Sequence, residues 1–179
     1  MGRQQTIWIT QTGVFLAVLI VAQAVTRPLG NTIVTGSVTN MLLILAVMLC
    51  GLSSAAVISV VSPVFATILG IGPLWPFIPF IIAGNLTLVA LWRLIALRRP
   101  ERSKALEVVA LFCAAAAKFL VLYFGVVRFV VPIVLGLGEP QASAVSIAFS
   151  WPQIITATVG GLLAMLLFPA LSKATTRIR

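Results

Sequence analysis

ALEVVALFCAAAAKFLVLYFGVV, residues 105–127, is an apolar run whose only charged members are Glu107 and Lys118. A helix needs roughly 20 predominantly apolar residues to cross the hydrocarbon core of a membrane, so this run predicts a membrane-spanning helix. Five further apolar runs lie before and after it in the sequence, at about residues 6–25, 33–50, 55–69, 77–97 and 145–171. The sequence therefore predicts an all-α membrane protein, a bundle of six transmembrane helices that forms one membrane domain over residues 1–179.

The overall composition excludes a soluble fold. Of the 179 residues, 61% are hydrophobic and only 8% are charged, whereas a soluble domain devotes about a quarter of its residues to charge. The net charge of +9 would suggest a nucleic-acid partner in a soluble chain. Here the basic residues lie mostly between and beyond the apolar runs, so they indicate membrane topology and predict no nucleic-acid binding.

The distribution of lysine and arginine predicts the orientation. One side of the expected bundle receives eight basic residues: Arg3, Arg98, Arg99, Arg102, Lys104, Lys173, Arg177 and Arg179. The opposite side receives Arg27 and Arg128. Because short cytoplasmic loops carry the excess of positive charge, we expect both termini in the cytoplasm of a multi-pass protein of the cell membrane.

Several kinds of chemistry lack the residues that they require. The chain has no histidine, no Walker A pattern and no C-x-x-C pair. None of its three acidic residues is predicted to lie deep in the membrane, which argues against the carboxylate relays of ion-coupled transporters. We therefore expect no enzyme activity, no metal site and no cofactor in this chain, and any ATP to be used by partner subunits.

Lys118 is the most informative polar residue. It follows about fourteen residues of helix from the cytoplasmic side, a depth of roughly 21 Å at 1.5 Å per residue. A charge at that depth costs about 3 kcal/mol unless it is paired or hydrated. Two arrangements fit: Lys118 faces an internal polar cavity, or its side chain snorkels along its own helix to the outer surface.

Other polar and aromatic residues fall in the same outer half of the bundle. Together they predict a substrate pocket that opens outward and is walled by the helices at 77–97, 105–127 and 145–171. The candidate substrate-binding residues are Lys118, Asn85, Gln153, Trp151, Arg128, Arg27, Asn31, Trp75 and Gln141. Asn85 and Gln153 also fit simple hydrogen bonds between helices, and Asn40 is either a packing residue or a further member of this site.

Charge constrains the expected ligand. The outer half contains Arg27, Lys118 and Arg128 but only one acid, Glu139. Such an excess favours a substrate with a carboxylate or phosphate group. A lysine in an apolar site can instead be neutral, which would remove this preference.

The first helix carries a short stripe of small residues. Gly13 and Ala17 are four residues apart, a spacing that allows close helix approach. The stripe serves either packing inside the bundle or docking of another membrane subunit.

Several segments resemble one transporter family. They are Gly13 to Ala17, Thr35-Gly36-Ser37-Val38-Thr39-Asn40, Ser62-Pro63, Pro76-Phe77-Ile78-Pro79-Phe80-Ile81-Ile82-Ala83-Gly84-Asn85 and Lys118-Phe119-Leu120. In these segments, spread over nearly the whole chain, the sequence resembles the substrate-binding S components of energy-coupling factor (ECF) vitamin transporters.

This resemblance implies a function. An S component captures a vitamin or related micronutrient from outside, associates with a transmembrane coupling subunit and two ATPases, and topples to release its cargo. It also implies that Gly13 and Ala17 dock the coupling subunit, although Val21 interrupts the small-residue pattern of the family. With the charge argument, the expected substrate is an anionic vitamin such as pantothenate or folate. The nickel and cobalt branch of the family uses an N-terminal histidine, which this chain lacks.

Two other functions fit the residues. The chain is alternatively a structural or assembly subunit of a membrane complex without its own ligand, or an independent small transporter or channel that acts as an oligomer. Ligand binding by the purified chain separates the S component from the assembly subunit, and transport without ATPases identifies the independent transporter.

Overall fold

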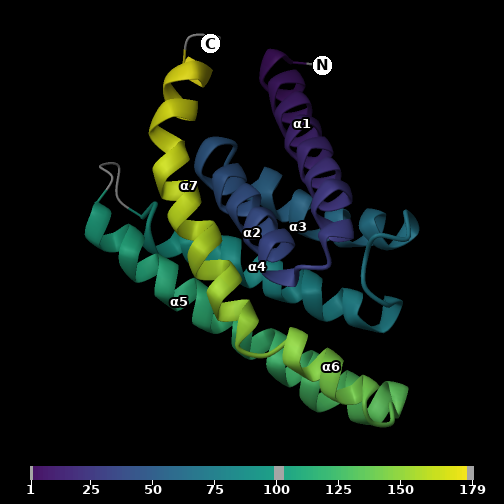
Figure 1. Cartoon of the computed structure of the whole chain (residues 1–179). Helices are drawn as coiled ribbons and strands as arrows, with labels where there is room; N and C mark the ends of the chain where they lie inside the picture. The colour runs from purple at the N-terminus through teal and green to yellow at the C-terminus, as the bar shows by residue number, and fades with distance from the viewer. Residues whose placement is uncertain (1, 99–102, 177–179) are drawn as a thin grey trace.

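The computed structural model describes residues 2–98 and 103–176, and every regular element in those ranges is helical (Figure 1). The α-helices are α1 (Arg3–Thr26), α2 (Thr32–Leu49), α3 (Leu52–Ile68), α4 (Ile78–Ile95), α5 (Lys104–Leu122), α6 (Gln141–Ala148) and α7 (Pro152–Thr176). Two short 3-10 helices are η1 (Arg27–Leu29) and η2 (Trp75–Phe77), and η3 (Tyr123–Leu135) is a π-helix. Arg99, Arg102, Arg177 and Arg179, which contribute to the charge asymmetry, lie outside the described residues.

The lengths of the helices confirm the predicted membrane bundle. Five helical segments of the described chain are long and apolar enough to span a membrane: Arg3–Leu29, Thr32–Leu49, Trp75–Ile95, Lys104–Leu135 and Gln141–Ala174. A sixth apolar helix, Leu52–Ile68, is slightly shorter. The first turn of α1 and the last turn of α7 lie at the same end of the bundle (Figure 1), as an even number of crossings requires.

The first four helices begin and end within three residues of the expected positions. The fifth expected helix, 105–127, is longer in the structure, because α5 continues directly into η3 and ends only at Leu135. Pro132 therefore does not end the helix. Val130 and Val131, which lie beyond the expected end at residue 127, are buried. Burial of their apolar side chains favours the extension, although proline cannot donate a backbone hydrogen bond.

The signal that ends this helix is Gly136. Its φ of 54° places it in the left-handed region, and its backbone N–H donates to the carbonyl of Val131. A left-handed residue after a helix is most often glycine, because glycine has no Cβ to clash there.

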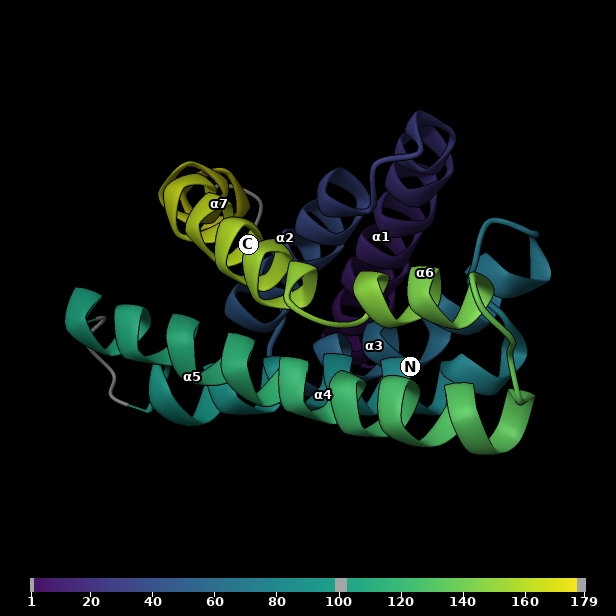
Figure 2. The same cartoon turned by 60° about the horizontal axis from the view of Figure 1, so that its bottom comes forward.

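The sixth expected helix, 145–171, is two helices in the structure. α6 ends at Ala148, and α7 begins at Pro152. Proline has no backbone N–H and disfavours helical geometry in the residue before it, so it suits the first turn of a new helix. The break allows α6 to turn back and pack against η3 (Figure 2).

Glycines permit the close contact between α2 and α7. A Cβ atom at Gly160 would lie 2.5 Å from the carbonyl oxygen of Ser37 and 2.8 Å from Cβ of Asn40. A Cβ atom at Gly36 would lie 2.8 Å from Cγ2 of Thr156. Only residues without a side chain allow two helix backbones to approach this closely.

The buried apolar residues form two clusters. The larger includes the Leu42–Val47 stretch of α2, Trp92 of α4 and Ala114 of α5. The smaller includes Phe77, Leu122 and Val126. Along α4 and α5, polar residues separate the two clusters, and these residues form the base of the pocket described next.

Candidate functional site

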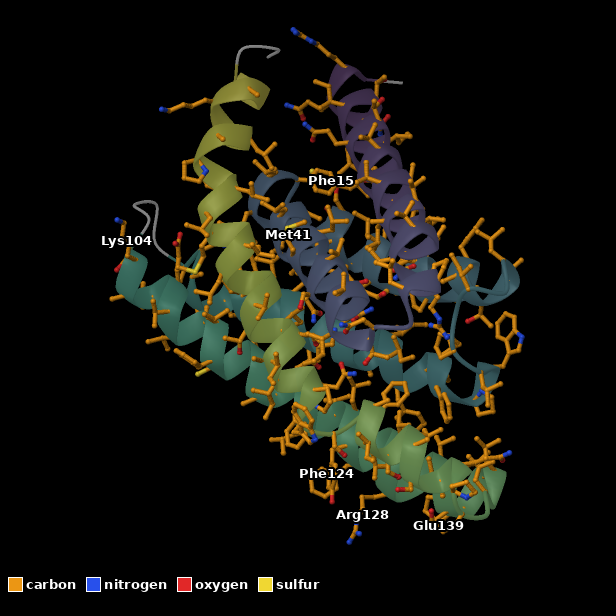
Figure 3. All side chains as sticks on the ribbon, viewed as in Figure 1. Phe15, Met41, Lys104, Phe124, Arg128 and Glu139 are labelled. Carbon is orange, nitrogen blue, oxygen red and sulfur yellow. The ribbon has the colours of Figure 1, made fainter. Side chains whose placement is uncertain are left out.

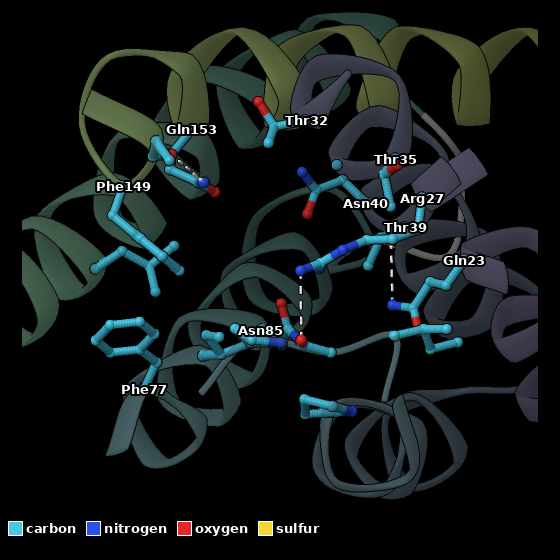
Figure 4. A pocket seen from close by; sticks show the side chains of 18 of the residues that line it. Gln23, Arg27, Thr32, Thr35, Thr39, Asn40, Phe77, Asn85, Phe149 and Gln153 are labelled. Carbon is cyan, nitrogen blue, oxygen red and sulfur yellow. Dashed lines mark hydrogen bonds between the residues drawn. The ribbon is translucent and has the colours of Figure 1, made fainter. Parts of the chain in front are cut away.

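A pocket of about 590 Å³ lies where the loops after α1 and after α3 meet α6 (Figure 4). It falls within the range of about 300–1,000 Å³ that is usual for small-molecule sites. It is lined by Gln23, Arg27, Gly30, Asn31, Thr32, Thr35, Gly36, Thr39, Asn40, Ser62, Pro63, Ile71, Gly72, Pro73, Leu74, Phe77, Ile81, Asn85, Lys118, Leu122, Ala144, Val145, Ala148, Phe149 and Gln153.

Three polar residues from three helices form the floor of this pocket. Nζ of Lys118 donates to Oδ1 of Asn40 at 2.5 Å and to Oδ1 of Asn85 at 2.8 Å. All three side chains are at most 4% exposed. The two amide oxygens partly solvate the ammonium group, and an ammonium has three N–H donors, so one donor remains for a ligand.

Close helix packing positions the floor. Asn40 also donates from Nδ2 to Oγ1 of Thr156 at 3.3 Å, and that hydroxyl donates to the carbonyl of Gln153 at 3.1 Å. These bonds connect α5 through α2 to α7. A Cβ atom at Gly84 would lie only 3.2 Å from Cγ of Leu122, so glycine also lets α4 approach α5 beside Lys118.

Helical spacing arranges the lining residues in layers. The lining residues at the start of α4 are spaced by four: Phe77, which directly precedes the helix, Ile81 and Asn85. On α5, the lining residues Lys118 and Leu122 have the same spacing. Residues four apart lie on one face of a helix, so each helix offers a single stripe to the pocket.

Two walls of different character rise from the floor (Figure 4). The polar wall comes from α1, η1, α2 and α3 and contains Gln23, Arg27, Thr32, Thr35, Thr39 and Ser62. The apolar wall comes from α4, α5, α6 and the adjoining residues, and contains Phe77, Ile81, Leu122, Val145 and Phe149.

The polar wall carries the second basic group of the pocket. Nη2 of Arg27 donates to the carbonyl of Gly72 at 3.3 Å, which leaves most of its five N–H donors available. Among the described residues that line the pocket there is no aspartate or glutamate. The pocket therefore favours negative charge.

Two buried polar atoms of the pocket lack a partner within the described chain. They are Oε1 of Gln23 and Oγ of Ser62. Gln23 uses its amide nitrogen to donate to the hydroxyl of Thr39 at 3.3 Å. An unsatisfied buried polar atom is unfavourable, so these two atoms are candidates for a hydrogen bond to a ligand or a water molecule.

The structure brings five of the nine candidate residues to the pocket: Lys118, Asn85, Arg27, Asn31 and Gln153. The Lys118 amine points inward, so it does not snorkel to the outer surface. Asn31 and Gln153 already have structural bonds. Oδ1 of Asn31 caps α2 by accepting from the N–H of Ile33 at 2.9 Å, and Nε2 of Gln153 donates to the carbonyl of Ala148 at 2.9 Å.

The other four candidates, Trp75, Trp151, Gln141 and Arg128, do not line the pocket. All four are exposed, and Trp75 and Trp151 retain 57% and 56% of their surface. Arg128 extends away from the bundle (Figure 3). Trp75, Gln141 and Trp151 lie at or between helix ends, and Arg128 lies on an exposed face of η3.

Several lining residues have no clear signal in the sequence. From its sequence position, Asn40 could be a packing residue or a residue of the site. In the structure it lies in the floor of the pocket. Gln23 and Arg27, and likewise Thr35 and Thr39, are spaced by four residues, a pattern that could have revealed a polar stripe. Phe77 and Phe149 resemble any other membrane phenylalanine, so sequence alone does not distinguish them.

An all-helical membrane bundle with a cationic pocket at one end has the architecture of a solute-binding membrane subunit. The family model described as "ECF transporter, substrate-specific component" matches residues 8–172. The chain therefore belongs to this family, whose members are transporter subunits that work with coupling and ATPase partners. Neither a curated protein nor a solved structure matches the chain.

Proposed function

We propose that this chain captures a small organic anion from outside the cell and presents it for ATP-driven import. The observation that carries this proposal is the buried Lys118 side chain, whose Nζ contacts only amide oxygens among the described residues and which shares a pocket with Arg27. A buried charge is costly unless an opposite charge or strong hydrogen bonds offset it. A carboxylate or phosphate on the ligand supplies that opposite charge.

Carboxylated vitamins are the leading candidates, with pantothenate and folate as examples. Their acid group fits the basic pocket, and the cavity of about 590 Å³ is large enough for a small organic molecule. The pocket lies at the end of the bundle opposite the first turn of α1, which carries Arg3, and the last turn of α7, which carries Lys173 (Figure 1). With both termini in the cytoplasm of the cell membrane, it faces outward, as substrate capture requires.

For transport, we propose association with a transmembrane coupling subunit and two ATPase subunits, which use the ATP. Gly13 and Ala17 of α1 are exposed, and a Cβ atom at Gly13 would meet nothing within 4 Å. Their exposure supports docking of a partner helix over packing inside the bundle. We propose that no metal or other cofactor takes part in capture by this chain.

Mass spectrometry of small molecules that co-purify with the protein tests the proposal. We expect an organic acid to accompany the wild-type chain and to be absent from Lys118→Met, which keeps the length of the side chain but removes its charge. Lys173→Met is the matched control, because Lys173 is exposed near the end of α7. Retention of the same acid by Lys118→Met would overturn the role of this lysine.

Two further outcomes would indicate the other functions. A purified chain that retains and binds no small molecule would favour an assembly subunit. Uptake of the co-purified acid into liposomes that contain this chain alone, without ATPases, would favour an independent transporter.

A further inference from the structure

The apolar wall of the pocket has a defined aromatic surface. The rings of Phe77 and Phe149 lie 5.4 Å apart between centroids and are inclined by 56°. Phe77 is 3% exposed and packs in the smaller apolar cluster with Leu122 and Val126. Phe149 is held against the same cluster from the end of α6. The two rings therefore present a supported apolar surface to the cavity.

The opposite wall offers polar groups that are not satisfied within the protein. Oε1 of Gln23 and Oγ of Ser62 are buried without a partner in the described residues, and both residues line the pocket. An amide oxygen accepts a hydrogen bond and cannot donate one. A ligand that satisfies Gln23 must therefore carry its own N–H or O–H donor.

The floor and the two walls impose three separate requirements on one ligand. The floor, with Lys118, takes an acid group; the wall of Phe77 and Phe149 takes an apolar group; and the wall of Gln23 and Ser62 takes a hydrogen-bond donor. A small inorganic anion meets only the first requirement. A short hydroxy acid meets the first and third but leaves the aromatic wall in contact with water.

We propose that the substrate is an amphipathic organic acid with an aromatic or branched apolar edge along one side and a hydroxyl or N–H donor on the other. This inference rests on the proposed capture of an organic anion and narrows it to a chemical class. Phe77 and Phe149 select the apolar edge, Gln23 selects the donor, and Lys118 binds the acid.

Four simple molecules separate these requirements. 4-Hydroxybenzoate has all three groups, benzoate lacks the hydroxyl donor, phenol lacks the acid, and glycolate lacks the apolar ring. Each is added at millimolar concentration to the purified full-length protein in detergent, and its affinity is derived from the shift in Tm. We expect 4-hydroxybenzoate to bind most tightly, with each missing group weakening binding by about tenfold.

Variants connect each requirement to its residue. Phe149→Ala should weaken binding of 4-hydroxybenzoate by about tenfold, whereas Phe149→Leu keeps an apolar group and should retain most of the affinity. Gln23→Leu should weaken 4-hydroxybenzoate but leave benzoate unchanged. Phe124→Ala is the control for loss of a phenylalanine, because Phe124 is 60% exposed, does not line the pocket and extends outward from the bundle (Figure 3).

The possible results separate this inference from the function on which it rests. Glycolate binding as tightly as 4-hydroxybenzoate, or an unchanged affinity in Phe149→Ala, would overturn the amphipathic ligand while leaving capture of an anion intact. Phenol binding as tightly as 4-hydroxybenzoate, with no effect of Lys118→Met, would instead overturn anion capture. Absence of binding by all four molecules would also overturn this inference.

Discussion

Lys118 and Arg128 lie on one continuous helical segment, α5 followed by η3, yet their surroundings are opposite. Lys118 is 4% exposed and donates to two amide oxygens in the pocket floor. Arg128 is exposed and points away from the bundle (Figure 3). Depth along a helix therefore says little about function until the helical face is also known, and the face is what separates these two cations.

The largest effect should come from removing the buried cation. Lys118→Ala takes the only ammonium from the described pocket, so we expect the affinity for the co-purified acid to fall about 30-fold or more. Isothermal titration calorimetry on protein freed of its ligand measures this change. An unchanged Kd would mean that the buried lysine has a structural role only.

A second substitution tests whether the charge of Lys118 is reserved for the ligand. Asn85→Asp places a carboxylate where Oδ1 now accepts from Nζ at 2.8 Å. The internal ion pair competes with the substrate, so affinity for the acid should fall about tenfold while Tm without ligand stays the same or rises. Asn85→Leu, which removes the acceptor, should instead lower Tm.

Arg27 should have a smaller effect than Lys118. It is exposed at the polar wall, where solvent screens its charge. We expect Arg27→Ala to weaken acid binding by about threefold to tenfold, mainly by slowing association, and to reduce the dependence of the rate on salt. Stopped-flow binding at two ionic strengths checks this. A loss as large as that of Lys118→Ala would show that Arg27 is the main anion contact.

The smallest effect should come from Arg128. Arg128→Ala should leave the affinity for the acid within about twofold of the wild type, because exposed substitutions away from a site rarely change energies by more than about 0.5 kcal/mol. The same calorimetric titration provides the comparison. A clear loss of binding would place Arg128 in the site after all and would remove the contrast with Lys118.

The sequence was sufficient for the membrane bundle, because apolar runs of this length rarely occur outside membrane-spanning helices. It also placed Lys118 and Asn85 at a common depth, since depth follows from counting residues. The sequence could not predict which face of the helix carries Arg128. The offset of ten residues between Lys118 and Arg128 fixes their separation along the helix axis. The face depends on the turns between them, and these turns are partly π-helical.

The limits of the sequence are equally clear for small and apolar residues. Gly13 and Gly160 each have small residues at helical spacing in the sequence. Gly160 nevertheless lies against the backbone of α2, whereas a Cβ atom at Gly13 would meet nothing within 4 Å. Which neighbour a glycine faces depends on the assembled bundle. The same applies to Phe77 and Phe149, which become site residues only when α6 folds back toward α4.

The two interruptions of helical structure that flank α6 have a consequence for changing the ligand specificity of this protein. α6 is a short helix between the helix end at Gly136 and the new helix start at Pro152. In contrast, α2 and α7 pack closely against each other at Gly36 and Gly160. A library of replaced residues confined to 144–149 should yield mostly folded variants with altered cargo. A library on the facing surfaces of α2 and α7 should yield mostly unfolded ones. On this expectation, Val145 and Phe149 at the end of α6 tune the ligand, while the contact between α2 and α7 holds the bundle together.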